Sequence, residues 1–326
     1  MTRTKPRAAL SFTARISRLL GQYGVWVALL LLLAFGALRY DGFLGVYNIA
    51  SVLRYNAMFG LIALGMMFVI MTGGIDLSVG SVAALSSVVA ALVSPYGWLA
   101  AALAGVLAAT ALGFVNGLIV TRLRILPFIA TLAMLLAARG LALVLAGNQS
   151  VSVATTGGFT DLGQGDFLGV PIPALILLVA FALGWLVLNH SGFGRHVLAL
   201  GGNEDASRLM GLDVNRIKLI VYTLSGALAG VAGVILAAQF SAGQPTEGLG
   251  WELSAIASVV VGGTLLTGGT GTVGGTLGGA LLLGLIFNVL NFENGRGVIS
   301  LSAYWQSVIR GFFLLGVVIL QNRQRN

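Results

Sequence analysis

Long apolar segments separated by short polar loops constrain the fold of this chain more than any other feature. A bilayer core about 30 Å thick needs about 20 apolar residues per helix. Only 9% of the 326 residues are charged and the mean hydropathy is +0.97, far from the composition of a water-soluble domain. The predicted membrane spans are residues 23–38, 51–72, 77–93, 98–121, 126–145, 170–188, 219–240, 253–266, 273–292 and 304–320.

The predicted fold class is therefore all-α, a polytopic membrane protein of about ten transmembrane helices. We expect a single transmembrane domain over residues 23–320, preceded by a basic segment at 1–22 and followed by a tail at 321–326. The span 253–266 is too short to cross a bilayer unaided, which favours a broken or re-entrant helix. The 47 glycines agree with a helix bundle in lipid, where small residues let backbones approach closely.

Basic residues are distributed unevenly between the two sides of the predicted bundle. With the N-terminus in the cytoplasm, the cytoplasmic segments hold thirteen of the 18 lysines and arginines, whereas the outside loops hold only Arg39, Arg54 and Arg296. Cytoplasmic loops of membrane proteins carry such an excess. We therefore expect both termini in the cytoplasm. The basic residues lie between spans, which indicates orientation in a membrane and not binding of nucleic acid.

Several kinds of chemistry are excluded by the residue inventory. The chain has no cysteine, and its two lysines, Lys5 and Lys218, do not follow a glycine, so it contains no Gly-Lys-Ser/Thr phosphate loop. His190 and His196 have no acidic or cysteine neighbours that would complete a metal site. We expect no metal and no cofactor on this chain. If transport is driven by ATP, the nucleotide and Mg²⁺ belong to a partner polypeptide.

A short acidic motif occurs twice and predicts an internal repeat. Asp76-Leu-Ser recurs as Glu252-Leu-Ser, and each copy opens an apolar helix after a glycine-containing turn. The copies are five spans apart, so they enter the membrane from opposite sides, which is the parity of an inverted repeat in transporters. The alternative is that an acidic residue followed by Leu-Ser is simply a favourable helix start.

The longest cytoplasmic loop, 189–218, carries signals for a short surface helix. Asn203 is a good N-cap, Glu204 and Asp205 fall in the first turn where the helix dipole favours carboxylates, and Gly211 suits a left-handed end. The motif predicts an exposed helix at the membrane surface. On spacing alone, an ordinary connector is an equally good interpretation.

Three stretches resemble the permease subunits of ribose- and galactose-type ABC importers, in the superfamily of branched-chain amino acid and ribose permeases. They are Gly-Gly-Ile-Asp-Leu-Ser-Val-Gly-Ser at 73–81, Gly-Gly-Asn-Glu-Asp-Ala at 201–206 with Gly211, and the glycine-rich run at 255–269. The likeness extends from about residue 25 to 320. It implies a bacterial inner-membrane subunit that imports a small sugar together with two ATPase domains, a second permease chain and a periplasmic sugar-binding protein.

The resemblance also assigns roles within the cytoplasmic loop. It implies that the loop helix is the coupling helix that seats in a groove of the ATPase, with Glu204, Ala206 and Gly211 in that role and Asn203 and Asp205 beside them. Asp205 departs from the family's usual Glu-Ala-Ala, which bears on the docking contact and leaves the spacing to the glycine intact. The stretch at 290–293 and the aromatic pair at 304–305 resemble galactofuranose-type permeases most.

Polar side chains within or beside the spans are candidates for a solute path, because such groups usually face a cavity or another helix. For each of them the alternative is helix packing or a bond to the backbone. The candidates are Asn56, Thr72, Asp76, Ser78, Asn116, Thr131, Glu252, Ser254 and Asn288.

The importer is weighed against two other functions. An ion-coupled secondary transporter would equally explain an inverted repeat, but it usually needs ionisable groups deep in the membrane, and the carboxylates here fall near the predicted span ends. An integral-membrane enzyme is disfavoured because neither histidine lies in a span and no cluster of carboxylates is present.

Overall fold

The computed structural model describes residues 12–154 and 157–295, together with 305, 308–309 and 311–312. Helices dominate this part of the chain, as predicted. They are α1 (Phe12–Arg39), α2 (Val46–Met71), α3 (Val79–Val93), the 3₁₀ turn η1 (Ser94–Tyr96), α4 (Trp98–Arg122), α5 (Pro127–Leu145), α6 (Asp161–Gln164), α7 (Ile172–His190), α8 (Gly192–Gly202), α9 (Glu204–Leu209), α10 (Val214–Phe240), α11 (Trp251–Val261) and α12 (Val273–Gly295).

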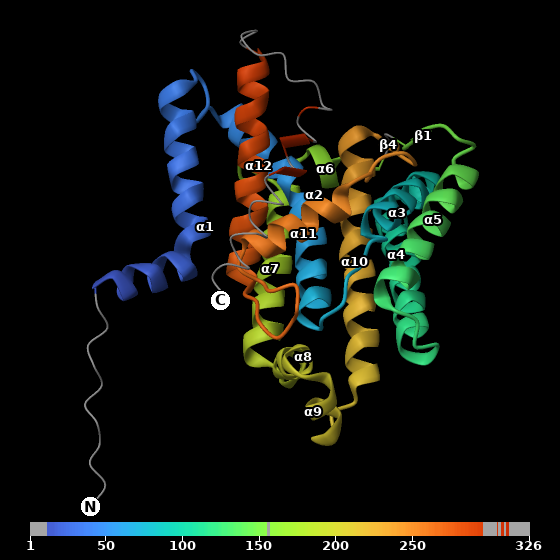
Figure 1. The fold of residues 1–326 in the computed structure, drawn as a ribbon. Coiled ribbons are helices and arrows are strands. Elements are labelled where there is room, and N and C mark those ends of the chain that lie inside the picture. Colours follow the sequence, from blue (N-terminus) through green and yellow to red (C-terminus); the bar gives the residue numbers. More distant parts are fainter. Residues whose placement is uncertain (1–11, 155–156, 296–304, 306–307, 310, 313–326) are drawn as a thin grey trace, which may run out of the picture.

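Two antiparallel strand pairs of two residues each accompany the helices, and the sequence reasoning did not anticipate them. The strand β1 (Val151–Ser152) pairs with β4 (Ala242–Gly243), and β2 (Asp166–Phe167) pairs with β3 (Val170–Pro171). The pair β1 and β4 joins loops at the end of the bundle away from α9 (Figure 1). The fold of the described residues therefore remains all-helical in its membrane part.

The predicted spans agree closely with the observed helices. Nine of the ten coincide with helices of the described chain, and the tenth, 304–320, lies almost entirely outside the described residues. Seven of the described helices are long and apolar enough to cross a membrane, and a shorter apolar stretch of α1 adds to them. As predicted, α11 is short: its 11 residues extend about 17 Å at 1.5 Å per residue, about half a bilayer core.

The helix α2 forms the centre of the bundle (Figure 1). Every residue from Ala57 to Met71 is buried except Phe59, which is partly buried, because α7, α10, α11 and α12 pack around the helix. A helix that is apolar on all sides is stable only in such surroundings. By contrast, α5 and α7 keep one apolar face exposed, with Leu136 and Leu183 more than half accessible. These outer faces suit contact with lipid.

Two non-helical segments each join a long helix to a shorter one. The first break, residues 72–78, joins α2 to α3, and the second break, residues 241–250, joins α10 to α11. The second break touches the first turn of α3, which follows the first break, where a Cβ added to Gly80 or Gly248 would overlap the carbonyl oxygen of the other glycine. The two backbones therefore touch without intervening side chains. We call this contact the glycine crossing.

Candidate functional site

The helix α9 forms at the predicted place with the predicted cap. The backbone N–H of Ala206 donates to the Asn203 side chain at 2.9 Å, and the Ser207 hydroxyl donates to the Asn203 carbonyl at 2.8 Å. Gly211 ends the motif with a φ of +84°, a conformation that favours glycine. The preceding helix α8 was not predicted, because its four glycines obscure the helical pattern.

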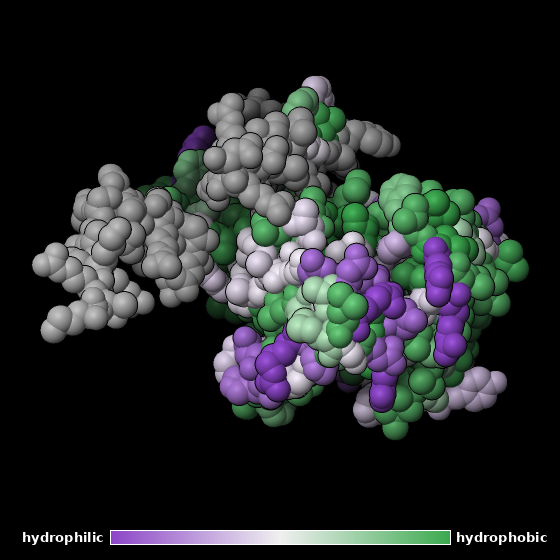
Figure 2. Space-filling view, turned by 60° about the horizontal axis from the view of Figure 1, so that its bottom comes forward, coloured by the Kyte–Doolittle hydropathy of each residue, from purple (hydrophilic) through white to green (hydrophobic). Residues whose placement is uncertain are grey.

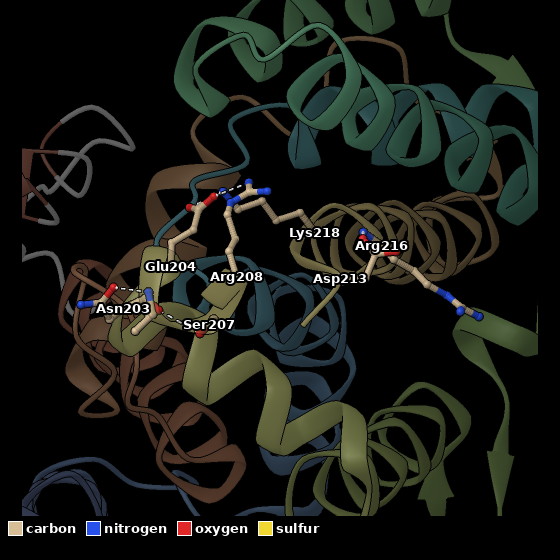
Figure 3. Close-up of polar contacts among 8 residues, drawn as sticks. Asn203, Glu204, Ser207, Arg208, Asp213, Arg216 and Lys218 are labelled. Atoms are coloured by element: carbon tan, nitrogen blue, oxygen red, sulfur yellow. Dashed lines mark hydrogen bonds and ion pairs between the residues drawn. The ribbon is translucent and has the colours of Figure 1, made fainter. Parts of the chain in front are cut away.

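A pair of ionic contacts fixes α9 to the start of α10. The Glu204 carboxylate accepts from Arg208 at 2.9 Å and from Lys218 at 2.7 Å, and the three side chains point toward one another, whereas Arg216 points away (Figure 3). Partial burial tends to raise the pKa of the Glu204 carboxyl, but the hydrogen bonds and positive charges of Lys218 and Arg208 outweigh it and hold the pKa below its ordinary value of 4.5. Glu204 therefore remains ionised at neutral pH.

The end of α9 presents two apolar side chains that the sequence analysis did not select. Leu209 is 90% exposed and Met210 is 69% exposed, while Asp205 also faces outward. Figure 2 brings this end of the molecule forward and shows polar side chains gathered on it with apolar surface between and around them. A leucine and a methionine within a polar loop could have been recognised in the sequence. Exposed apolar side chains of this kind are often buried by a partner protein.

The loop 189–218 packs against the bundle at one place and borders a groove at another. Gly201 at the end of α8 packs against Met71 and Gly269, and the Gly269 N–H donates to the Met71 carbonyl at 3.0 Å. Beside α9, a groove of about 530 Å³ separates Glu204 and Lys218 from the turn between α4 and α5. The loop therefore contacts the end of α2, where the first break begins, and it lines a groove that the start of α5 lines from the other side.

A cavity of about 730 Å³ lies at the end of the bundle opposite α9. Its position follows from α10, which begins beside α9 and lines the cavity with its last turn. We call it the outer cavity. Two predicted path residues, Asn56 and Asn288, face it. Asn288 and Asn48 also exchange hydrogen bonds in both directions, at 2.7 and 3.1 Å. Further amide side chains in the wall are Gln164, Gln239 and Asn291.

Aromatic rings form another part of the cavity wall. The ring centroids of Tyr55 and Phe59 lie 5.2 Å apart, and those of Phe59 and Trp251 lie 4.8 Å apart. Arg54 at the edge is paired with Asp166 at 2.7 Å, so its charge is compensated. Uncharged amides beside aromatic faces can bind a neutral polar solute through hydrogen bonds and ring contacts.

Four other candidates form a separate buried cluster in and around the first break. Asp76 is 1% exposed, and its carboxylate accepts from the Ser78 N–H at 3.0 Å, the Ser78 hydroxyl at 2.6 Å and the Ser225 hydroxyl at 2.8 Å. Asn116 donates to the Ser78 hydroxyl at 2.9 Å. Thr131 lies 3.4 Å from the carbonyl oxygen of Ile75, although its closer acceptor is the Pro127 carbonyl.

The position of Asp76 corrects one sequence inference. We expected the carboxylates near the ends of spans, but Asp76 bonds to Ser225, the twelfth of the 27 residues of α10, and so lies against the middle of that helix. The reason is that the first break is extended and re-enters the bundle before α3 begins. The position of the Asp76 carboxylate therefore no longer argues against an ion-coupled transporter.

The remaining candidates are dispersed. Thr72 donates to the Val69 carbonyl at 2.7 Å, which is the packing alternative. Ser254 lines a narrow extension of about 20 Å³ beside the outer cavity. Glu252 lies next to the glycine crossing, since a Cβ on Gly80 would be 3.1 Å from its Oε2 atom. The described residues contain no group of three or more His, Cys, Asp or Glu side chains placed to bind a metal ion.

Comparison with known proteins identifies the family. The model of the "Branched-chain amino acid transport system / permease component" family matches residues 48–318. The chain belongs to this permease family. It is 42% identical over 310 residues to the ribose import permease protein RbsC of Escherichia coli, covering 92% of this permease and 93% of the relative. No solved structure matches the chain.

Other relatives carry similar names. The permease is 41% identical over 304 residues to the ribose import permease protein RbsC of Bacillus subtilis, covering 92% of each chain. It is 38% identical over 311 residues to the L-arabinose ABC transporter permease protein AraH of Azospirillum brasilense, covering 95% of this permease and 90% of the relative. The chain is thus a multi-pass transport subunit and not an enzyme, and ATP hydrolysis belongs to a separate chain.

Proposed function

We propose that this permease is the translocation subunit of an ATP-driven importer for a pentose. Its relatives are named for ribose and L-arabinose, which favours a pentose over the galactofuranose suggested by residues 290–293. The observation that carries the proposal is α9, a capped and ion-paired helix whose Leu209 and Met210 project from the bundle and need a partner surface. That partner is an ATPase subunit, and the end of the bundle that carries α9 is cytoplasmic, in agreement with the charge bias.

The outer cavity is the proposed entry to the solute path. On this orientation it faces the periplasm, where a sugar-binding protein would deliver the solute, and Asn56 and Asn288 would contact its hydroxyl groups. We assign Asp76, Ser78 and Asn116 to holding the first break in place, because their polar atoms bond mainly to one another and to the backbone. A second permease chain would complete the complex.

An inverted repeat fits this arrangement. Each break follows a long helix, α2 or α10, and leads into a shorter one, α3 or α11, and the glycine crossing joins the start of α3 to the second break. The acidic residues are not equivalent, however, since Asp76 precedes α3 by three residues and Glu252 is the second residue of α11. Inverted repeats with interrupted helices place solute sites at such junctions.

The family disfavours the ion-coupled transporter, but Asp76, a carboxylate buried against the middle of α10, is the one feature of the described residues that would suit it. Such groups serve ion coupling in membrane proteins. The two candidates differ in their energy source. Uptake by vesicles that contain the assembled complex should follow ATP for the importer and an imposed proton or sodium gradient for the alternative.

The decisive experiment compares two sets of exposed apolar sites. The double variant Leu209→Ser with Met210→Ser should lose at least about tenfold of the co-purifying ATPase, because a few well-packed central side chains carry most of the energy of an interface, at about 2 kcal/mol or more each. The control is Leu168→Ser, at a residue that is 89% exposed at the other end of the bundle. Retention of the ATPase by the double variant, measured by mass spectrometry of the purified complex, would contradict the proposal.

A further inference from the structure

Arg139 is a charged residue in an otherwise apolar span. It is the thirteenth of the 19 residues of α5, and α5 contains no other charged side chain. Placing an arginine within a membrane helix is costly unless the group finds partners, and such residues usually face the interior of the bundle. The contacts of this guanidinium therefore indicate why the helix carries it.

The guanidinium binds the backbone of the second break. Its Nη1 group donates to the carbonyl oxygen of Glu247 at 2.6 Å and also to the carbonyl of Pro245. Its Nε and Nη2 atoms are buried and have no hydrogen-bond partner among the described residues. The charges of Glu252 and Glu247 lie close enough to interact with it. Arg139 thus fastens the peptide backbone of the break to α5 and keeps further donors available.

The same helix reaches the first break and the cytoplasmic groove. Thr131 lies about two turns before Arg139 on α5 and approaches the carbonyl oxygen of Ile75 at 3.4 Å. Leu126 and Pro127 at the start of α5 line the groove of about 530 Å³ that also contains Glu204. One helix therefore connects the surroundings of α9 with both extended segments.

We propose that Arg139 is a positioning residue for transport, which fastens the second break to α5 and so passes movement of the α9 groove to the glycine crossing. The inference rests on the proposed importer function. Movement of α9 against its ATPase displaces the turn between α4 and α5, and α5 carries the carbonyls of Pro245 and Glu247 with it. The second break, with Glu252 beside the crossing, then changes position between inward-facing and outward-facing states.

The absence of cysteine allows a clean reporter on the second break. Leu249→Cys places one thiol two residues after Glu247, at a position that is 73% exposed and lines the outer cavity. A membrane-impermeant thiol reagent measures its accessibility in the assembled complex, without nucleotide and after trapping with ATP and vanadate. With Arg139 present, the labelling rate should differ several-fold between the two states.

Arg139→Gln should remove that difference and lower uptake at least tenfold, while the ATPase still co-purifies and hydrolyses ATP. Arg139→Lys keeps the charge but lacks the planar guanidinium that reaches two carbonyls, so the labelling rate should again be the same in both nucleotide states. This variant replaces Arg139→Gln in the experiment if the glutamine variant does not assemble. The control is Arg39→Gln, whose guanidinium lies 3.7 Å from Glu293 at the end of α1. This control should keep both the uptake and the nucleotide response of the reporter.

Two failures of the experiment have different meanings. In the first, the thiol at position 249 responds to nucleotide equally with Arg139 present and with glutamine or lysine in its place, and uptake is unchanged. The proposed role of Arg139 is then wrong, whereas the proposed importer function is unaffected. In the second, with Arg139 present, the labelling rate does not change with nucleotide but changes with an ion gradient. The proposed importer function is then wrong, and so is the role of Arg139 that depends on it.

Discussion

The two breaks are alike in course but differ in how their polar groups are bound. In the first break, Asp76 is buried and accepts three hydrogen bonds from side chains and backbone of its own surroundings. In the second break, Glu247 and Leu249 are exposed, and Arg139 holds the backbone while keeping buried donors without a partner among the described residues. We expect the more completely bonded segment to resist displacement more than the other. We therefore treat the first break as the scaffold and the second as the part that moves, although the Oδ1 atom of Asn116 beside the first break is also buried without a partner among the described residues.

The largest expected effect tests the scaffold. Asp76→Ala leaves the Ser78 N–H and two hydroxyl groups without their acceptor in a buried site, and each unsatisfied group costs about 1–3 kcal/mol, so the loss should be about 3 kcal/mol or more. Thermal unfolding of the detergent-solubilised permease measures it. Glu252→Ala beside the second break is the matched change and should shift the unfolding temperature far less. Equal shifts for the two variants would remove the distinction between the breaks.

An intermediate effect tests the glycine crossing. Gly80→Ala would place a Cβ against the Gly248 carbonyl oxygen, and Gly248→Ala would place one against the Gly80 carbonyl at a φ of +80°. Overpacking of this kind costs about 1–3 kcal/mol. Gly140→Ala in α5 is the control, because its Cβ would meet nothing within 4 Å. If uptake and unfolding temperature of the two crossing variants matched those of the control, the backbones would not touch there.

The smallest effect concerns α9, which lies outside both breaks. Because the pKa of Glu204 is lowered in the folded protein, its ion pairs stabilise α9 above the ordinary pKa of 4.5 and lose that contribution as the pH falls through the folded value. The protection of the α9 amides against hydrogen exchange, taken relative to the intrinsic rate at each pH, should therefore fall slightly below about pH 4.5, and Glu204→Gln should abolish this pH dependence. A matching change in the amides of residues 72–78 would show that the scaffold is not independent of α9.

Local signals predicted local structure well. The positions of the spans follow from apolar length, and the cap at Asn203 and the left-handed end at Gly211 follow from side-chain chemistry within a few residues. The short α11 was also expected from length alone. These features depend on neighbouring residues along the chain, which is why the sequence suffices for them.

The relations between distant segments were not predictable in the same way. Ser225 is one polar residue in a long apolar helix, and nothing in its neighbourhood along the chain indicates that it binds Asp76, 149 residues away. The depth of Asp76 likewise depends on how an extended segment packs against α10. The outer cavity collects Asn56 and Asn288 from helices far apart in the chain, and their companions Gln164 and Gln239 lie outside the predicted path.

If the solute path proposed above passes the glycine crossing, the crossing also has an electrical consequence. A bilayer that maintains an ion gradient tolerates a solute path only if small ions do not pass along it between transport cycles. Where Gly80 and Gly248 meet, carbonyl oxygens occupy the volume that even a methyl group would need, so a file of water has no room to form between the two backbones. Side chains at these two positions would separate the backbones, and ion leakage would then be limited only by how well those side chains filled the gap.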